Sequence, residues 1–324
     1  MFGNKLIIIF LIIYLPMIQI SAAYSYDPND FAVEVVEYIE GTGVGNDAIS
    51  GEPFNEPNSA LGRPTLETTG DGTSIDPNIN VPVVPVYPAF RYFEVVTIGD
   101  GNGSITLKFN HRVSNDDNNL YGIDFIIFGN AKLSGGGFWT NGNPEDVTVS
   151  SAVFNEPGIV SVSQNGTDWY TFDTGPYADD FAPTAGYRWD AVNDVWADEL
   201  DPTRPIEPNL SASDVDGYTV AEVIDSYDGS AGGTGFDLEE LEPNDFNSLS
   251  VDPNSNRRWI QYVRIEDKPG SAAKTEVDAV ADVSACGDYK HPYPEGDVNK
   301  NCVVDFGDIA IITRSWLDCS WNCQ

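Results

Sequence analysis

The stretch IVSVSQNGTDWYTF, residues 159–172, predicts a β-hairpin and decides the fold class. Its first half is rich in β-branched residues that partly alternate with serine, and its second half is aromatic. Between the halves, Asn165-Gly166 can adopt the positive φ values that a tight primed turn needs. We therefore expect two antiparallel strands joined by a short turn.

Five further segments share this composition of β-branched and aromatic residues in partial alternation. They are VEVVEY (33–38), SITLKFN (104–110), IDFIIF (123–128), WIQYVRI (259–265) and VDAVADV (277–283). Turn-forming clusters such as GDGNGS (99–104) and LSGGGFWTNGNP (133–144) separate them. No long segment before residue 300 shows helical periodicity. The pattern predicts a mainly β protein, an antiparallel β-sandwich with long acidic loops over residues 24–285.

The N-terminus predicts export. Lys5 precedes the apolar run LIIIFLIIYLPMIQI, and the small residues Ser21, Ala22 and Ala23 follow. This is the pattern of a signal peptide spanning residues 1–23. The alternative, a membrane anchor, is disfavoured because a bilayer span needs about 20 apolar residues and Pro16 interrupts this run. We expect a secreted or cell-surface protein with no membrane span after signal removal.

The charge is strongly acidic. The 324 residues carry 16 Lys and Arg against 51 Asp and Glu, a net charge of −35, and loss of Lys5 gives 15 − 51 = −36. Such a field repels nucleic acid, which is therefore excluded as a partner, and anionic lipid. The 41% of hydrophobic and 12% of aromatic residues are too many for a disordered acidic chain. A folded domain with a solvated acidic surface is expected.

One segment is unusually acidic. Residues 177–252 contain nineteen Asp or Glu against two Arg. Such a long excursion is either ordered, with cations offsetting its charge, or a flexible insert. Aromatic residues scattered through it favour order: Tyr187, Trp189, Trp196, Tyr218 and Phe236.

The C-terminal segment 286–324 contains a candidate calcium loop, GDVNKNCVVDFGD (296–308). Calcium takes six to eight oxygen ligands, and the alternate residues of a tight loop can turn theirs inward together. The helical spacing of apolar residues in FGDIAIITRSWL (306–317) supplies the helix that should leave such a loop. Two departures are Cys302, where glycine is usual, and an aspartate at the last position; an ordinary acidic turn is the alternative. The predicted ligands are Asp297, Asn299, Asn301, Val303, Asp305 and Asp308.

The four cysteines all lie in this last segment. In an exported chain an even, clustered set predicts two disulfides, for which three connectivities are open. Zinc is the weaker alternative, since the surrounding residues are rich in oxygen ligands. The cysteines are Cys286, Cys302, Cys319 and Cys323.

Two resemblances add to this prediction. The blocks SALGRPT, GDGNGSITLKFNH, YGIDFIIFGNA, EPGIVSVSQNGTDWYTF, GTGFDLEEL, RWIQYVRIED and TEVDAVADV resemble a family of large bacterial cell-surface proteins. That resemblance implies a galactose-binding-like jelly roll, an extracellular binding role and no catalytic residues. The tail CGDYKHPYPEGDVNKNCVVDFGDIAIITRSWLDC resembles a type I dockerin repeat, especially a cysteine-bearing variant of planctomycete-type surface proteins. It implies the same six calcium ligands and a cohesin-like scaffold as partner, although a full dockerin carries two repeats and this chain has one.

The sequence offers little for catalysis. Of the two histidines, His111 ends a predicted strand and His291 precedes the calcium loop, and neither has a nucleophile motif beside it. A glycoside hydrolase needs two carboxylates at a set separation. Asp124, Asp237 and Asp278 lie in apolar surroundings and are candidate buried acids; in a secreted sandwich such acids more often bind structural calcium or cap turns.

For ligand binding, aromatic faces beside amides suit sugar rings. Trp139, flanked by glycines, is the best surface candidate, together with Phe138 and Asn141, whereas Trp169 and Tyr170 are expected in the hairpin core. We therefore expect a secreted or cell-surface, calcium-binding, non-catalytic attachment protein, with extracellular polysaccharide as the candidate ligand. The alternatives are a hydrolase component of a polysaccharide-degrading system and a purely structural surface protein.

Overall fold

The computed structural model describes residues 27–70, 76–135, 139, 142–269, 274–283, 293, 295–299, 304 and 306–315. Several predictions concern residues that lie outside these described ranges. They concern the signal peptide (1–23), Phe138, Asn141, His291, three predicted calcium ligands (Asn301, Val303, Asp305) and the four cysteines (Cys286, Cys302, Cys319, Cys323).

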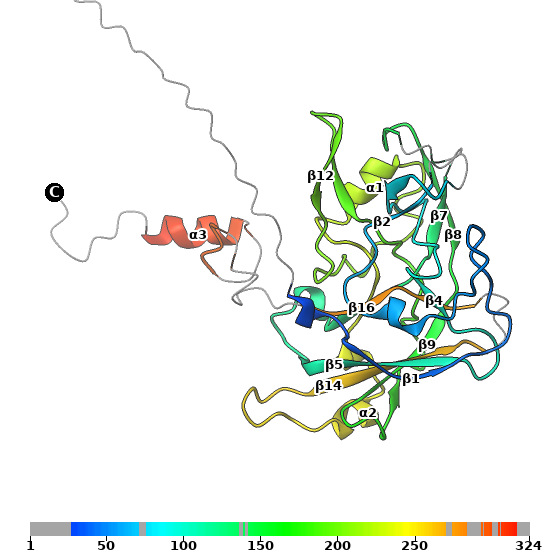
Figure 1. Ribbon diagram of the computed structural model, residues 1–324. Helices are drawn as coiled ribbons and strands as arrows, with labels where there is room; N and C mark the ends of the chain where they lie inside the picture. Colours follow the sequence, from blue (N-terminus) through cyan, green and yellow to red (C-terminus); the bar gives the residue numbers. More distant parts are fainter. Residues whose placement is uncertain are drawn as a thin grey trace, which may run out of the picture.

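The protein is mainly β, as predicted, and its largest sheet has five antiparallel strands. Their spatial order is β1 (Glu34–Ile39), β5 (Ser104–Ser114), β14 (Trp259–Asp267), β9 (Gly158–Ser163) and β10 (Tyr170–Thr171). Long β5 and β14 form the centre of this sheet, which occupies one side of the molecule in Figure 1. Each of these strands overlaps a segment that the sequence predicted.

A second antiparallel sheet has three strands, with β6 (Phe125–Phe128) between β13 (Thr234–Phe236) and β16 (Ala279–Asp282). All four residues of β6 are buried. Phe125 and Ile127 pack with the five-stranded sheet in one core, whereas Ile126 and Phe128 belong to a second core on the other face. Burial on both faces explains why this strand is continuously apolar instead of alternating.

The acidic segment 177–252 is ordered, as its aromatic residues predicted; its residues 182–231 form a third layer, whereas residues 234–236 are strand β13 of the three-stranded sheet. It supplies Leu200, Val215, Val220 and Ile224 to the second core. In Figure 1 the strand β16 lies between the five-stranded sheet and the part that carries β12 (Val195–Glu199) and α1 (Val220–Ser226). The carboxylates of this layer therefore lie on a segment that packs its apolar side chains against the three-stranded sheet.

The remaining elements are short. Four more antiparallel pairs are formed by β2 (Glu67–Thr69) with β3 (Asn80–Pro82), β4 (Val96–Thr97) with β15 (Glu276–Val277), β7 (Lys132–Gly135) with β8 (Val149–Phe154), and β11 (Tyr187–Asp190) with β12. The helices are α2 (Pro243–Ser248), α3 (Phe306–Ser315), and the 3₁₀ turns η1 (Pro28–Asp30), η2 (Pro57–Ala60), η3 (Leu120–Gly122) and η4 (Leu238–Glu240). No helix in the described part of the chain is long and apolar enough to cross a membrane.

The predicted hairpin is present, but its predicted tight turn is wrong. β9 and β10 pair with Tyr170 opposite Val162, and residues 164–169 form a longer loop. Gly166 has φ +76°, but Asn165 does not share this left-handed conformation. The side-chain oxygen of Asn165 instead accepts from the backbone N–H groups of Thr167 and Asp168, each at 2.9 Å. This Asx-type bonding stabilises the wider loop.

Candidate functional site

A cleft of about 500 Å³ opens where β15, β7 and β8 approach the segment 87–90. A volume of this size is typical of small-molecule sites. We call it the acidic cleft, and its lining combines aromatic rings, amides, a lysine and two glutamates. The lining residues are Tyr87, Pro88, Phe90, Asn130, Lys132, Phe154, Asn155, Glu156 and Glu276.

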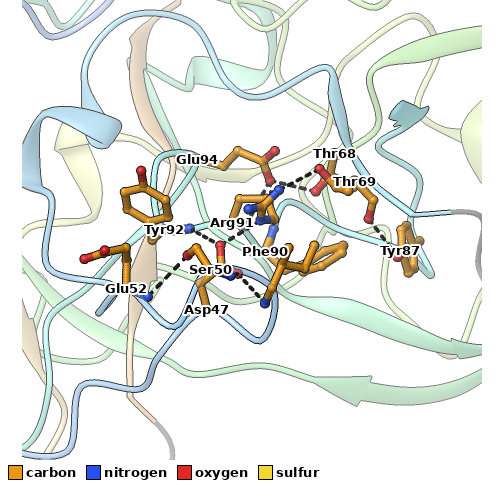
Figure 2. Close-up of polar contacts among 11 residues, drawn as sticks. Asp47, Ser50, Glu52, Thr68, Thr69, Tyr87, Phe90, Arg91, Tyr92 and Glu94 are labelled. Atoms are coloured by element: carbon orange, nitrogen blue, oxygen red, sulfur yellow. Dashed lines mark hydrogen bonds and ion pairs between the residues drawn. The ribbon is translucent and has the colours of Figure 1, made fainter. Parts of the chain in front are cut away.

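The aromatic wall of the cleft is held by hydrogen bonds to β2 and to Glu94. The Tyr87 hydroxyl donates to the Thr69 carbonyl at 3.0 Å, and the rings of Tyr87 and Phe90 meet edge to face with centroids 5.1 Å apart. The backbone N–H of Phe90 donates to Glu94 Oε2 at 3.1 Å. These contacts, drawn in Figure 2, fix both rings against β2.

Behind this wall lies a buried ion pair. Arg91 Nε donates to Asp47 Oδ2 at 2.7 Å and Arg91 Nη1 to Thr69 Oγ1 at 2.9 Å. Figure 2 shows the guanidinium between these two partners. Burial alone would raise the pKa of Asp47, but the Arg91 guanidinium and the backbone amides of Ile49, Ser50 and Tyr92 lower it. Asp47 therefore stays ionised, and the pair ties segment 47–52 to the cleft wall.

Glu94 completes the network as a buried acceptor. Burial raises its pKa, while hydrogen bonds from Thr68 Oγ1 at 2.7 Å and from the Phe90 and Arg91 amides act in the opposite direction. Each polar group of this buried network therefore has a hydrogen-bond partner, as a rigid wall requires.

The floor of the cleft carries two glutamates in direct hydrogen-bond contact, Glu156 and Glu276. Burial, followed by the charge of Glu156, raises the pKa of Glu276 to about 7. Thr97 Oγ1 donates to Glu276 Oε1 at 2.7 Å, and the Asn130 amide donates to its other oxygen. Burial also raises the pKa of Glu156. Since two touching carboxylates cannot both ionise easily, we expect the pair to share one proton near neutral pH.

A third carboxylate, Asp179, lies beneath the pair. It is fully buried, and burial raises its pKa well above the usual range, with Glu276 and Glu156 adding to the effect. Ala131 N donates to Asp179 Oδ1 at 2.8 Å and Glu276 N to Oδ2 at 3.1 Å. Asp179 thus joins the acidic segment to β15 and to the loop after β6, and it positions Glu276.

The arrangement is suited to binding hydroxyl-rich ligands. Phe154, whose side chain is 61% exposed, offers a ring face at the rim, with Lys132 Nζ 5.4 Å from its centroid. The glutamates can accept, and Asn130, Asn155 and Lys132 can donate. Aromatic faces beside such groups match both the apolar and the polar surfaces of a sugar ring.

The predicted buried acids take structural positions. Asp124 is 0% exposed and accepts from Asp116 N, Asn119 Nδ2 and Leu238 N at 3.2, 3.0 and 2.9 Å. Burial raises its pKa to about 8. It therefore fastens two turns, one of the two roles that the sequence suggested.

Asp278 and Asp237 differ from one another. Asp278 is 1% exposed, accepts from Thr65 N and Oγ1 at 2.9 and 3.0 Å, and separates β15 from β16; burial raises its pKa to about 8. Asp237 is only partly buried and caps η4 by accepting from Glu239 N at 2.8 Å. The three predicted acids therefore lie at separate places in the fold, and none lines the acidic cleft.

The expected exposure of Trp139 is wrong. Its side chain is 4% exposed and packs in the second core, with its ring centroid 6.2 Å from that of Trp196, which in turn meets Trp189. The flanking glycines suggested a surface loop, but the acidic segment covers this ring. Tyr170 packs against the main core as expected, and Trp169 lies under the Arg264 guanidinium.

His111 has a partner in the second sheet. Its Nε2 lies 2.7 Å from Asp282 Oδ2, so the imidazole links β5 to β16. This contact agrees with the structural role that the sequence favoured.

Of the predicted calcium ligands, Asp297, Asn299 and Asp308 are described. Asp308, in the first turn of α3, is 1% exposed, and its Oδ1 accepts from Val298 N at 2.7 Å and Asn299 N at 3.1 Å. The two ends of the loop therefore meet. Among the described residues, no group of three or more His, Cys, Asp or Glu is arranged to hold a metal ion.

Sequence reasoning missed the residues of the acidic cleft. Glu156 and Glu276 are 120 positions apart, and the residues around each of them form ordinary strand and turn patterns that do not indicate a site. Only the pairing of β15 with β4 and the close approach of β8 bring them together.

Comparison with known proteins gives no relative from which to carry over a role: neither a protein-family model nor a curated protein matches this chain. Fold and site together define a mainly β, antiparallel protein with an aromatic, carboxylate-floored cleft.

Proposed function

We propose that this chain is a secreted or cell-surface, non-catalytic binding protein whose sandwich is of the jelly-roll kind and whose acidic cleft holds carbohydrate. The observation that carries the proposal is the combination, in one cleft, of an exposed ring with amides and paired carboxylates. The predicted signal peptide supports export. The strongly acidic charge makes neutral sugars better ligands than polyanionic ones.

A glycan array followed by calorimetry tests this proposal. We expect at least one neutral glycan to bind, and Phe154→Ala to weaken it about tenfold, or about 1.4 kcal/mol, because the ring loses its stacking face. Tyr218→Ala is the matched control, since Tyr218 is also exposed but does not line the cleft. Silence across the array, or equal losses in the two variants, would favour the structural-protein alternative.

A hydrolase is the second candidate, and the Glu156–Glu276 pair is the observation in its favour. A carboxyl whose pKa is about 7 could serve as a general acid. However, glycosidase carboxylates stand about 5–5.5 Å apart in retaining enzymes and about 6.5–9.5 Å apart in inverting ones. Glu156 and Glu276 interact with one another through a hydrogen bond, whereas a glycosidase holds its two carboxylates on either side of the scissile bond. Turnover of any polysaccharide that Glu276→Gln abolishes while the fold is retained would nevertheless establish the enzyme.

Calcium binding by the C-terminal loop is also part of the proposal. It is supported by the closure of Asp308 onto residues 298–299, which places the first and last predicted ligands near one another. We expect Asp297→Ala to remove one calcium equivalent and chelation to lower the melting temperature. An unchanged stoichiometry would reject the loop as a calcium site. Docking onto a cohesin-like scaffold would be a further step, to be tested by calcium-dependent capture of this chain by a cohesin.

A further inference from the structure

A second cavity, of about 590 Å³, lies beside the edge strand β13, away from the acidic cleft. The two cavities share none of the described residues that line them. We call this one the glycine pocket. Its walls are Ile123, Thr174, Gly175, Pro176, Phe181, Ile206, Pro208, Leu210, Gly233, Thr234, Gly235 and Glu240.

Two glycines leave the backbone of β13 bare along the pocket. A Cβ on Gly235 would come within 2.9 Å of the Ile123 side chain, and one on Gly233 within 2.6 Å of Ile126. Packing against Ile123 and Ile126 therefore requires glycine at both positions. As a result, the main chain on either side of Thr234 forms part of the pocket wall.

The side chains that line the pocket are mainly apolar. Phe181, Ile206 and Leu210 supply an apolar surface against which the body of a ligand can lie.

The charge of the pocket has one sign. Among the described residues that line it, Glu240 is the single ionisable one, and Asp237 lies close enough for its charge to act on Glu240. No lysine or arginine is among the described residues of the wall. A ligand that carries a positive charge would therefore be favoured over an isosteric neutral or anionic one.

We propose that the glycine pocket binds a small organic cation, an amine with an apolar body, whose nitrogen pairs with Glu240 while its body lies against Phe181 and Leu210. This site is independent of the carbohydrate proposal, because the two cavities have no described lining residue in common.

Three ligands of one shape test the charge preference: cyclohexylamine, cyclohexanol and cyclohexanecarboxylate. Binding to the mature protein is measured by calorimetry and by ¹⁵N chemical-shift changes at Gly233 and Gly235. We expect the amine to bind about tenfold more tightly than the alcohol, and the carboxylate more weakly than either. Equal affinity for amine and alcohol, or no binding of the amine at millimolar concentration, would overturn the proposal.

Two charge-neutralising variants locate the cation. Glu240→Gln should bring the affinity for the amine down to that for the alcohol. Glu239→Gln neutralises the residue just before Glu240, which does not line the pocket, and should leave the affinity for the amine unchanged. Equal losses in the two variants would mean that only the general acidic field attracts the amine. Leu210→Trp, which fills the pocket, should abolish binding; retained binding would place the ligand elsewhere and contradict the assignment.

Discussion

The glutamate pair predicts a specific effect of pH on stability, which Glu276→Gln should remove. Burial beside Glu156 raises the pKa of Glu276 from 4.5 to about 7. The folded state therefore holds a proton that the unfolded state has lost between these two values. By linkage, the contribution of Glu276 to stability is greatest below pH 4.5 and is lost as pH rises to about 7.

The magnitude follows from the size of that shift. Two and a half pKa units correspond to about 3 kcal/mol if the whole shift belongs to Glu276. Because Glu156 shares the proton and the Glu276 side chain keeps some contact with solvent, we expect about 1–2 kcal/mol. Glutamine can still accept from Thr97, and Asn130 can turn its carbonyl oxygen toward the new amide. The variant should match the wild type at pH 4.5 and exceed it by this amount at pH 8.

Urea denaturation at pH 4.5, 6, 7 and 8 measures the effect. Glu37→Gln is the control, since Glu37 is exposed on β1 and should leave the pH profile unchanged. If Glu276→Gln has the same pH profile as the wild type, or is less stable than it at pH 8, the reasoning about the pair is wrong.

Three further substitutions test the packing around the cleft and the second core. Arg91→Met leaves Asp47 buried without its charge partner and should lower the free energy of unfolding by about 3–5 kcal/mol in urea titrations; a loss below about 1 kcal/mol would contradict the buried pair. Gly129→Ala places a Cβ 2.3 Å from Asp179 Oδ1 and should lower the melting temperature by several degrees, whereas an unchanged value would show that Asp179 lies elsewhere. Trp139→Ala should lower the free energy of unfolding by about 3–5 kcal/mol and leave glycan affinity unchanged. Unchanged stability with weaker glycan binding would instead show that Trp139 is an exposed, sugar-binding residue.

The strands could be predicted because their pattern is local. Residues 104–110 and 259–265 form the centre of the large sheet, and both are rich enough in β-branched and aromatic residues to be recognised without their partners. The helix α1 could also have been predicted. Thr219 and Glu222 form a capping box at its first turn, and Val220, Val223 and Ile224 are its buried residues. This helix was not predicted because seven residues are too few to show helical periodicity in the sequence.

The cleft could not be predicted, because it depends on contacts between distant segments. Nothing near Glu276 in the sequence indicates that Thr97, Asn130 and Glu156 will surround it. The predicted exposure of Trp139 was wrong for a related reason. Its glycine-rich neighbours predict a loop, but its burial depends on Trp196, 57 positions later. Local sequence describes the strands, whereas the site arises from where the connecting segments lie.

The most direct test of the central claim is a crystal structure of the mature protein with the best-binding glycan from the array. We expect a sugar ring stacked on Phe154 or Tyr87, with a hydroxyl within hydrogen-bond distance of Glu276. Sugar bound elsewhere on the protein, with the acidic cleft holding only water, would contradict it.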